Sequence, residues 1–298
     1  MQGAGIVNSD NKKNFSDALF ILKIRDHEFN KIRELVHDHF GINLSNEKKM
    51  LVVGRLQKYL KENGFESFKD YLIFLESDQT GKALSDLINR ISTNYTYFFR
   101  EKEHFNFLNS VALPEIVGKH RAAGSRDLRI WSAGCSAGDE AYSLVITMKE
   151  FLGTEYNEWD AGLLATDISA TVLNEAKKGL YTRKRLGELN NVTIGKYFIE
   201  NKNSVFQLKS DILDEVTFRR FNLINDNFPF KKKFEVISCR NVMIYFDSQT
   251  REELVNKLYD FTVDGGYLFI GHSETLNKKK CAYNFIQPGI YRKGGENV

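Results

Sequence analysis

Three segments with small or polar residues follow apolar runs that have the composition of β-strands. In Ser132–Glu140, small residues would let a ligand approach the backbone of Gly134, where a helix begins and its first N–H groups are unpaired. Asp167 places a carboxylate at a strand end, the usual acceptor for ribose hydroxyls. In Cys239–Val242, the amide of Asn241 could bind an adenine edge or an amino acid's polar groups. The structural alternatives are a tight turn, a helix N-cap and a turn residue, respectively.

Together these segments predict a nucleoside cofactor and no metal. The glycines do not fit the dinucleotide pattern GxGxxG, and Asp167 follows them by more than the roughly 20 residues of that pattern. No GxxxxGK[ST] phosphate loop is present, and Lys31 stands where HExxH needs its second histidine. The three cysteines are too far apart for a CxxC zinc site or a disulfide framework. Cys135 could be a thiol nucleophile, but a small buried cysteine is the favoured interpretation.

The elements that must position these residues alternate between strand and helix patterns from Leu128 onward. This alternation predicts a parallel, doubly wound α/β sheet. The expected strands are 128–131, 162–166, 234–238 and 267–270, with Gly265-Gly266 leading into the last. The run 285–292, interrupted by Pro288-Gly289, predicts a closing antiparallel strand at the sheet edge. Two further runs, Ser204–Leu208 and Val216–Leu223, break the alternation and predict a small antiparallel β insertion at about 197–221.

The preceding part of the chain has helical periodicity. Residues 26–94 predict a small all-helical domain of four helices, with Ser45 and Ser67 as candidate N-caps. Residues 1–25 are polar and predict a flexible N-terminal arm. Residues 95–298 then form the larger domain that carries the three segments.

Composition limits the class of partner and compartment. The 298 residues carry a formal net charge of +3, which gives no strong field for nucleic acid or anionic lipid. No apolar run approaches the roughly 18 residues of a membrane-spanning helix, and the N-terminus lacks the apolar core of a secretory signal. We therefore expect a cytoplasmic protein, a monomer, with no nucleic-acid partner and no direct insertion into a membrane.

Several longer blocks resemble the CheR family of chemotaxis receptor methyltransferases, which use S-adenosylmethionine. Thr93–Glu101 resembles the family signature TNxTxFFRE, and Arg129–Ser143 is similar to its RxWSAGCSxGEEPYS loop. Three further blocks match in the same order: Thr166–Ile168, Cys239–Phe246 and Gly271–Glu274. The resemblance covers about residues 26–292. The chain departs from the family pattern at Asp139, Ala141 and Thr275, but Glu140 keeps its carboxylate.

The resemblance implies methyl transfer from S-adenosylmethionine to a glutamate side chain, which gives a γ-methyl ester and the product S-adenosylhomocysteine. A glutamate carboxylate, with a pKa of about 4.3, is already ionised and needs neither a general base nor a metal. Arg100 and Tyr245 would lie nearest the transferring methyl, and Asn222 and Leu223 would flank the adenine. The full cofactor-binding set is Asn94, Thr96, Arg100, Gly134, Glu140, Asp167, Asn222, Leu223, Asn241 and Val242.

The implied partner is the cytoplasmic signalling domain of methyl-accepting chemotaxis receptors, which in this family is an acidic helical bundle. On a helical wheel, the apolar residues of the second helix share one arc, and Lys48, Arg55 and Lys58 lie on the other side. We therefore expect these three basic residues to bind the receptor. An ordinary solvated face is the alternative.

Some family members grip a pentapeptide at the receptor's C-terminus by strand addition to the insertion, and they have a longer loop there that contains glycine. Here the corresponding stretch, Ile199–Val205, is short and has no glycine, which predicts docking that does not depend on the tail.

Two other functions stay open. The chain could be a methyltransferase for another substrate, although no [DNS]PP[YFW] loop is present, or a non-catalytic adaptor that binds cofactor and receptor.

Overall fold

The computed structural model describes residues 22–92 and 95–294. They form two compact units: Leu44–Ile91 with the described residues up to Leu35, and Val36–Asn43 with the chain from Ser92 onward. Most of the expected N-terminal arm lies outside the described residues. Its last residues do not fit a loose arm, because Leu22 and Ile24 are buried. Within the described residues, no helix combines the length and apolar character that a membrane span requires.

Short helices of 10 to 15 residues build the first unit, as the periodicity predicts. They are α1 (Asp26–Phe40), α2 (Lys49–Glu62), α3 (Phe68–Ser77) and α4 (Lys82–Ile91), with a 3-10 turn at Asn46–Lys48. Ser67 caps α3, because its hydroxyl accepts a hydrogen bond from the Asp70 N–H at 3.2 Å. Ser45 does not act as expected: it precedes the 3-10 turn, and its hydroxyl donates to Glu47 instead.

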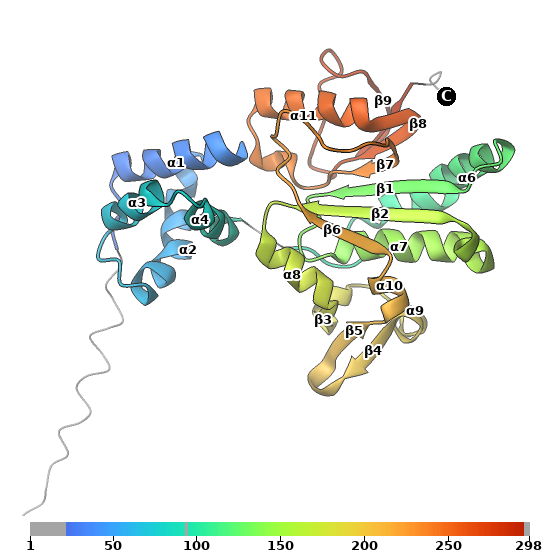
Figure 1. Cartoon of the computed structure of the whole chain (residues 1–298), viewed down its shortest axis with the longest axis horizontal. Coiled ribbons are helices and arrows are strands. Elements are labelled where there is room, and N and C mark those ends of the chain that lie inside the picture. The colour runs from blue at the N-terminus through green and yellow to red at the C-terminus, as the bar shows by residue number, and fades with distance from the viewer. Residues whose placement is uncertain (1–21, 93–94, 295–298) are drawn as a thin grey trace, which may run out of the picture. The chain divides into compact units, whose positions relative to one another are not determined.

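The second unit is built on a seven-stranded sheet with the order β6-β2-β1-β7-β8-β10-β9 (Figure 1). The first five of these strands are parallel, and β10 runs antiparallel to β8. The single closing strand expected at 285–292 is instead an antiparallel hairpin of β9 and β10 that turns at Pro288-Gly289, and β9 forms the edge of the sheet. Gly265 and Gly266 lie inside β8 rather than before it. The strands are β1 (Asp127–Ala133), β2 (Asp160–Asp167), β6 (Val216–Arg220), β7 (Phe234–Ser238), β8 (Thr262–Phe269), β9 (Tyr283–Gln287) and β10 (Ile290–Lys293).

Helices cover both faces of this sheet, which confirms the doubly wound fold (Figure 1). Successive residues of a strand point to opposite faces. Ile130 of β1 therefore packs in one apolar cluster with α5, α6 and α7, whereas Trp131 packs in another with α11. The helices are α5 (Lys102–Phe107), α6 (Leu113–Ala122), α7 (Asp139–Leu152), α8 (Ala170–Lys178), α9 (Asn191–Tyr197), α10 (Ser210–Leu213) and α11 (Ser248–Phe261), and a π-helical turn at Leu108–Ala112 joins α5 to α6.

The antiparallel insertion is a separate three-stranded sheet with the order β3-β5-β4. Its strands are β3 (Leu180–Thr182), β4 (Phe198–Asn201) and β5 (Val205–Leu208). The expected boundary at 197–221 was wrong at both ends. The run from Val216 is β6 of the main sheet, where Phe218 pairs with Ala165 of β2, and the three-residue β3 is too short to show a periodic pattern.

Candidate active site

A cavity of about 380 Å³ opens in the second unit where β1, β2 and β7 end. This volume is in the range of small-ligand sites, and the carboxyl ends of parallel strands are where such sites form. Asn94, one of the expected cofactor residues, lies outside the described residues. Every other predicted cofactor or catalytic residue lines this cavity: Thr96, Arg100, Gly134, Glu140, Asp167, Asn222, Leu223, Asn241, Val242 and Tyr245.

The turn after β1 needs a glycine at Gly134. Its φ is +86°, a region that other residues rarely adopt, and a Cβ there would lie 2.4 Å from Cγ2 of Val242. The N–H groups of Gly134 and Cys135 both donate to the Thr166 carbonyl, at 2.8 and 2.9 Å. These bonds hold the turn against the end of β2. The missing side chain therefore lets Val242 pack against the turn, and both residues line the cavity.

Asp167 ends β2 and is half-buried at the cavity wall. Its Oδ2 accepts from the Ser136 N–H and its Oδ1 from the Ser169 N–H, both at 2.9 Å. The N-cap of α8 is Ser169, which accepts from the Val172 N–H, so capping does not account for Asp167. Burial raises the pKa of Asp167, against the lowering effect of the backbone donors. Each carboxylate oxygen can accept further hydrogen bonds from ligand hydroxyls.

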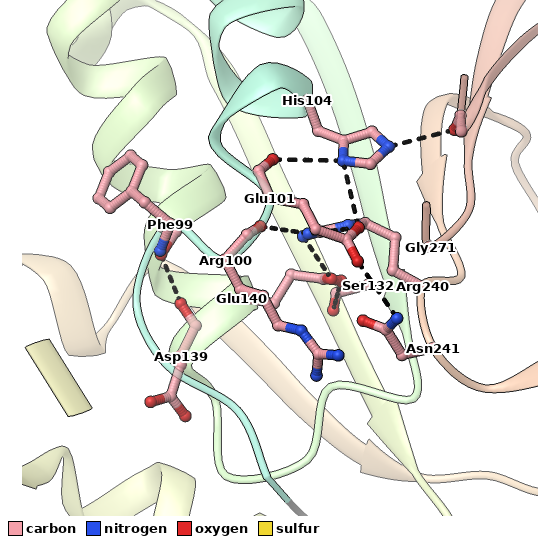
Figure 2. A network of polar contacts seen from close by, with 12 residues as sticks. Phe99, Arg100, Glu101, His104, Ser132, Asp139, Glu140, Arg240, Asn241 and Gly271 are labelled. Atoms are coloured by element: carbon pink, nitrogen blue, oxygen red, sulfur yellow. Dashed lines mark hydrogen bonds and ion pairs between the residues drawn. The ribbon is translucent and has the colours of Figure 1, made fainter. Parts of the chain in front are cut away.

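A buried arginine, Arg240, links the expected site residues to one another (Figure 2). Its guanidinium lies 3.1 Å from the carboxylates of both Glu101 and Glu140 and also donates to the Arg100 carbonyl. The side chain is only 3% exposed, so the three charges attract one another with little screening by water. Glu140 also accepts from the Ser132 hydroxyl at 2.7 Å. Its carboxylate therefore holds the cavity wall together.

The loop that carries Asn241 is held by a second buried carboxylate, Glu274. Asn241 has a φ of +58°, and its N–H donates to Glu274 at 2.9 Å. The N–H of Ile244 donates to the same carboxylate at 3.2 Å. Burial raises the pKa of Glu274, and the backbone donors oppose this shift. The Asn241 amide group donates to Glu101 at 3.3 Å, so that its other polar atoms stay available at the cavity.

Arg100 and Tyr245 are half-buried and line the same cavity. The Arg100 guanidinium donates to the Tyr95 carbonyl at 2.9 Å. Among the described ion pairs, none joins Arg100 to its acidic neighbours Glu101 or Glu103. The remaining guanidinium donors can therefore bind a carboxylate.

The expected adenine neighbours reach the cavity from the segment after β6. Asn222 donates through Nδ2 to the His39 carbonyl at 2.8 Å, and its Oδ1 accepts from the Ile224 N–H at 3.3 Å. The Asn222 side chain thus fixes the segment after β6 and ties it to the His39 carbonyl. Leu223 supplies buried apolar surface to the cavity.

Cys135 is 1% exposed, and burial raises the pKa of its thiol well above the ordinary value. A thiol held in its protonated form is a poor nucleophile. The structure therefore supports the interpretation of Cys135 as a small buried residue.

Sequence reasoning missed Glu101, Arg240 and Glu274 as individual site residues, although each lies in a block that carries the family resemblance. The available signal was chemical. Arg240 comes two residues after the buried strand Phe234–Ser238, where an ionised side chain needs a buried partner of opposite charge.

Two protein-family models together match almost all of the described chain. Residues 94–291 match the family described as "CheR methyltransferase, SAM binding domain", and residues 27–92 match "CheR methyltransferase, all-alpha domain". The chain belongs to the CheR methyltransferase family. S-adenosylmethionine is therefore its cofactor and methyl transfer its reaction class.

Individual relatives agree with this assignment. The chain is 42% identical over 272 residues to the chemotaxis protein methyltransferase of Borreliella burgdorferi, a match that covers 91% of this chain and 96% of that protein. It is 33% identical over 273 residues to the Escherichia coli protein of the same name, covering 91% and 92%. Among solved structures, PKMT2 from Rickettsia typhi in complex with AdoHcy aligns with a TM-score of 0.30 and 16% identity, covering 48% of this chain and 20% of that one, a likeness too slight to support an argument.

The cavity of this CheR-family protein fits its cofactor chemically. The turn at Gly134 lines the cavity, and the Asp167 carboxylate can accept from ribose hydroxyls. Leu223 and Val242 add apolar surface beside these polar groups.

Proposed function

We propose that this CheR-family protein methylates glutamate side chains of methyl-accepting chemotaxis receptors and forms γ-methyl esters. The observation that supports this most is the position of Arg100 and Tyr245 in the same cavity as Gly134, Asp167 and Asn241. The named relatives are chemotaxis protein methyltransferases and support the receptor as substrate.

The cofactor supplies an electrophilic methyl group on a sulfonium. The chain's own residues position the acceptor carboxylate and the cofactor relative to each other. A glutamate carboxylate is ionised at neutral pH, so the acceptor needs no base. Arg100 offers guanidinium donors that can hold a carboxylate, and the Tyr245 ring lines the same space. The carboxylates of Glu140 and Asp167 already accept hydrogen bonds from the protein. Holding the reacting atoms in line can contribute about 7–11 kcal/mol of the acceleration.

Incubation with tritiated S-adenosylmethionine and receptor-bearing membranes tests this proposal. We expect label on the receptor that mild base releases, because carboxyl methyl esters hydrolyse and methylated amines do not. Tyr245→Phe and Arg100→Ala should reduce the labelling without unfolding the protein. Base-stable label would indicate another substrate, and binding of cofactor and receptor without label would indicate an adaptor.

We further propose that Lys48, in the 3-10 turn before α2, and Arg55 and Lys58 of α2 dock the receptor. The apolar side faces inward as the helical wheel predicts, with Val52, Val53, Leu56 and Leu60 buried. Lys58 is 84% exposed and lies 3.7 Å from Glu62. Arg55 differs from the expectation of a free surface charge, because its half-buried guanidinium donates to the Ile91 carbonyl at the end of α4. Reversing its charge would therefore disturb the packing of the helices as well as any docking.

Lys58→Glu combined with Lys61→Glu tests this surface without touching Arg55. Both side chains are exposed, and we expect receptor methylation at low salt to slow roughly three- to tenfold and to depend less on salt. The matched control is Lys231→Glu with Lys233→Glu, an equal charge change on exposed lysines of the second unit. Equal rates for the two double variants would contradict the docking surface.

We propose, finally, that the small sheet does not bind the receptor's tail. The turn between β4 and β5 reaches positive φ without glycine, at Asn203 (+67°) and Ser204 (+56°). The turn nevertheless stays short, since Asn201 already pairs with Val205. A fluorescence titration with the pentapeptide Asn-Trp-Glu-Thr-Phe should show no saturable binding. Micromolar binding that Ile199→Pro at the β4 edge abolishes would contradict this proposal.

A further inference from the structure

We propose that Glu101, His104 and His272 form a binding site for a divalent transition-metal ion, with Zn²⁺ as the best match, and that occupancy of this site weakens cofactor binding. One ligand atom from each residue lies within 4.8 Å of the others. The sequence predicted no metal, because His272 lies far along the chain from the Glu101 and His104 pair and no local spacing joins all three. The inference concerns the cofactor pocket and does not depend on which substrate is methylated.

The three side chains come from two elements that the fold brings together. Glu101 is the N-cap residue of α5 and His104 lies one turn later, a Glu-x-x-His spacing that places both on one side of the helix. His272 follows the end of β8, and its backbone N–H donates to the Glu101 carboxylate at 3.3 Å. The His104 and His272 rings lie 4.8 Å apart between centroids. Two imidazoles and one carboxylate are a ligand set that Zn²⁺ uses.

The distances fit a metal on the Nδ1 side of His104. This nitrogen lies 3.5 Å from Oε2 of Glu101 (Figure 2). Two ligand atoms at about 2.0–2.1 Å from a tetrahedral Zn²⁺ are separated by roughly 3.3 Å. His272 is exposed, so its ring can turn to complete the site, and water can take the fourth position.

The surroundings of His104 give a second, independent indication. Its side chain is 1% exposed, and both ring nitrogens face oxygen atoms: Nδ1 faces Glu101, and Nε2 lies 3.3 Å from the Gly289 carbonyl. A neutral imidazole has one N–H, so one of these nitrogens must point a lone pair at an acceptor. A metal on Nδ1 removes the conflict, because Nε2–H can then donate to the Gly289 carbonyl.

The carbonyl at Gly289 resembles the outer contact that orients most metal-binding histidines. The backbone there has a φ of +76°, and a Cβ would lie 2.5 Å from Nε2 of His104. Only a glycine allows this close approach. The glycine at position 289 therefore places a backbone carbonyl beside the buried Nε2 of His104.

The site is coupled to the cofactor pocket through Glu101. Its carboxylate holds Arg240 at 3.1 Å and the Asn241 amide at 3.3 Å, and both residues line the cavity. A metal bound to Glu101 competes with these contacts for the same oxygen atoms. Occupancy should therefore loosen Arg240 and Asn241 and weaken the binding of S-adenosylhomocysteine.

Calorimetric titration of the full chain with ZnCl₂ tests the site. The parent is Cys281→Ser, because Cys281 is the more accessible cysteine of the described chain and could bind zinc by itself. We expect one Zn²⁺ per chain in the parent and binding that is roughly ten- to a hundredfold weaker after His272→Ala. His27→Ala removes another exposed histidine, far from this cluster in the sequence, and should leave binding unchanged. Co²⁺ in place of Zn²⁺ should give the visible absorption of a tetrahedral complex in the parent and not in His272→Ala.

The effect on the cofactor is measured in the same proteins. Saturating Zn²⁺ should weaken S-adenosylhomocysteine binding several-fold in the parent and leave it unchanged in His272→Ala. The proposal is overturned if the parent binds no zinc, if His272→Ala binds it as tightly as the parent, or if bound zinc does not change the affinity for S-adenosylhomocysteine.

Discussion

Replacement of Arg240 by methionine is expected to lower the free energy of unfolding by about 3–5 kcal/mol, the cost of leaving buried charges without their partner. Methionine fills similar space, so the change removes the charge and little volume. It leaves the carboxylates of Glu101 and Glu140, which are 15% and 13% exposed, without the cation that both of them contact. Urea denaturation of the cofactor-free protein measures the difference.

The matched control is Arg126→Met. Arg126 and Glu158 form an ion pair at the surface, with side chains that are 47% and 59% exposed. Exposed pairs contribute about 0–1 kcal/mol, so this variant should unfold close to the wild type. Equal, small losses in both variants would contradict the role of Arg240 as the residue that holds the cavity together.

The Arg240 effect should also depend on pH. Burial acts to raise the pKa of Glu101, but the charge of Arg240 and hydrogen bonds from Asn241, Arg240 and the His272 backbone hold it below its ordinary value of 4.5. A carboxyl with a lowered pKa in the folded state stabilises the protein above the pKa of the unfolded chain, and this contribution is lost as the pH falls through the folded-state pKa. The difference in stability between wild type and Arg240→Met should therefore shrink below about pH 4.5.

Asp167→Ala is expected to weaken S-adenosylhomocysteine binding by about 2–3 kcal/mol, or roughly 30- to 150-fold. The change removes a charged acceptor for two ribose hydroxyls. It also frees the N–H groups of Ser136 and Ser169, which the carboxylate now holds beside the cavity. Calorimetric titration with S-adenosylhomocysteine measures the loss.

Two further variants separate the carboxylate's charge from its shape. Asp167→Asn keeps one acceptor oxygen and should give an intermediate loss. Because burial raises the pKa of Asp167, wild-type affinity should fall on acidification as the carboxyl takes up its proton, whereas Asp167→Asn should not show that fall. Asp160→Ala at the other end of β2 removes an exposed carboxylate and should leave affinity unchanged. Unchanged affinity in Asp167→Ala would refute the assignment of Asp167 to the ribose.

Much of the fold could be predicted because local patterns and tertiary structure agree. Strands 128–131 and 162–166 appear at their expected places within β1 and β2, because each has an apolar pattern that the parallel sheet buries. The β insertion could not be bounded from sequence. Val216–Arg220 alternates like a half-buried strand in either sheet, and only its pairing with β2 decides between them.

The site was predictable where a residue's type alone indicates its chemistry. Gly134, Asp167 and Asn241 follow strands, and the fold places them together. Arg240, Glu101 and Glu274 act through partners that are 30 to 140 positions away in the sequence, so no local pattern indicates the pairing. The cluster of Glu101, His104 and His272 could not be predicted either, because His272 is distant in sequence from the other two residues.

The most direct test of the central claim is mass spectrometry of a receptor signalling domain after incubation with this protein and S-adenosylmethionine. The account predicts that proteolytic peptides gain the mass of one CH₂ group per modified site and that fragmentation places the gain on glutamate side chains. Mild base should remove it, and Tyr245→Phe should lower its rate. A gain on lysine, arginine or a backbone terminus, or no gain while the protein binds both S-adenosylhomocysteine and the receptor, would contradict glutamate methylation by this chain.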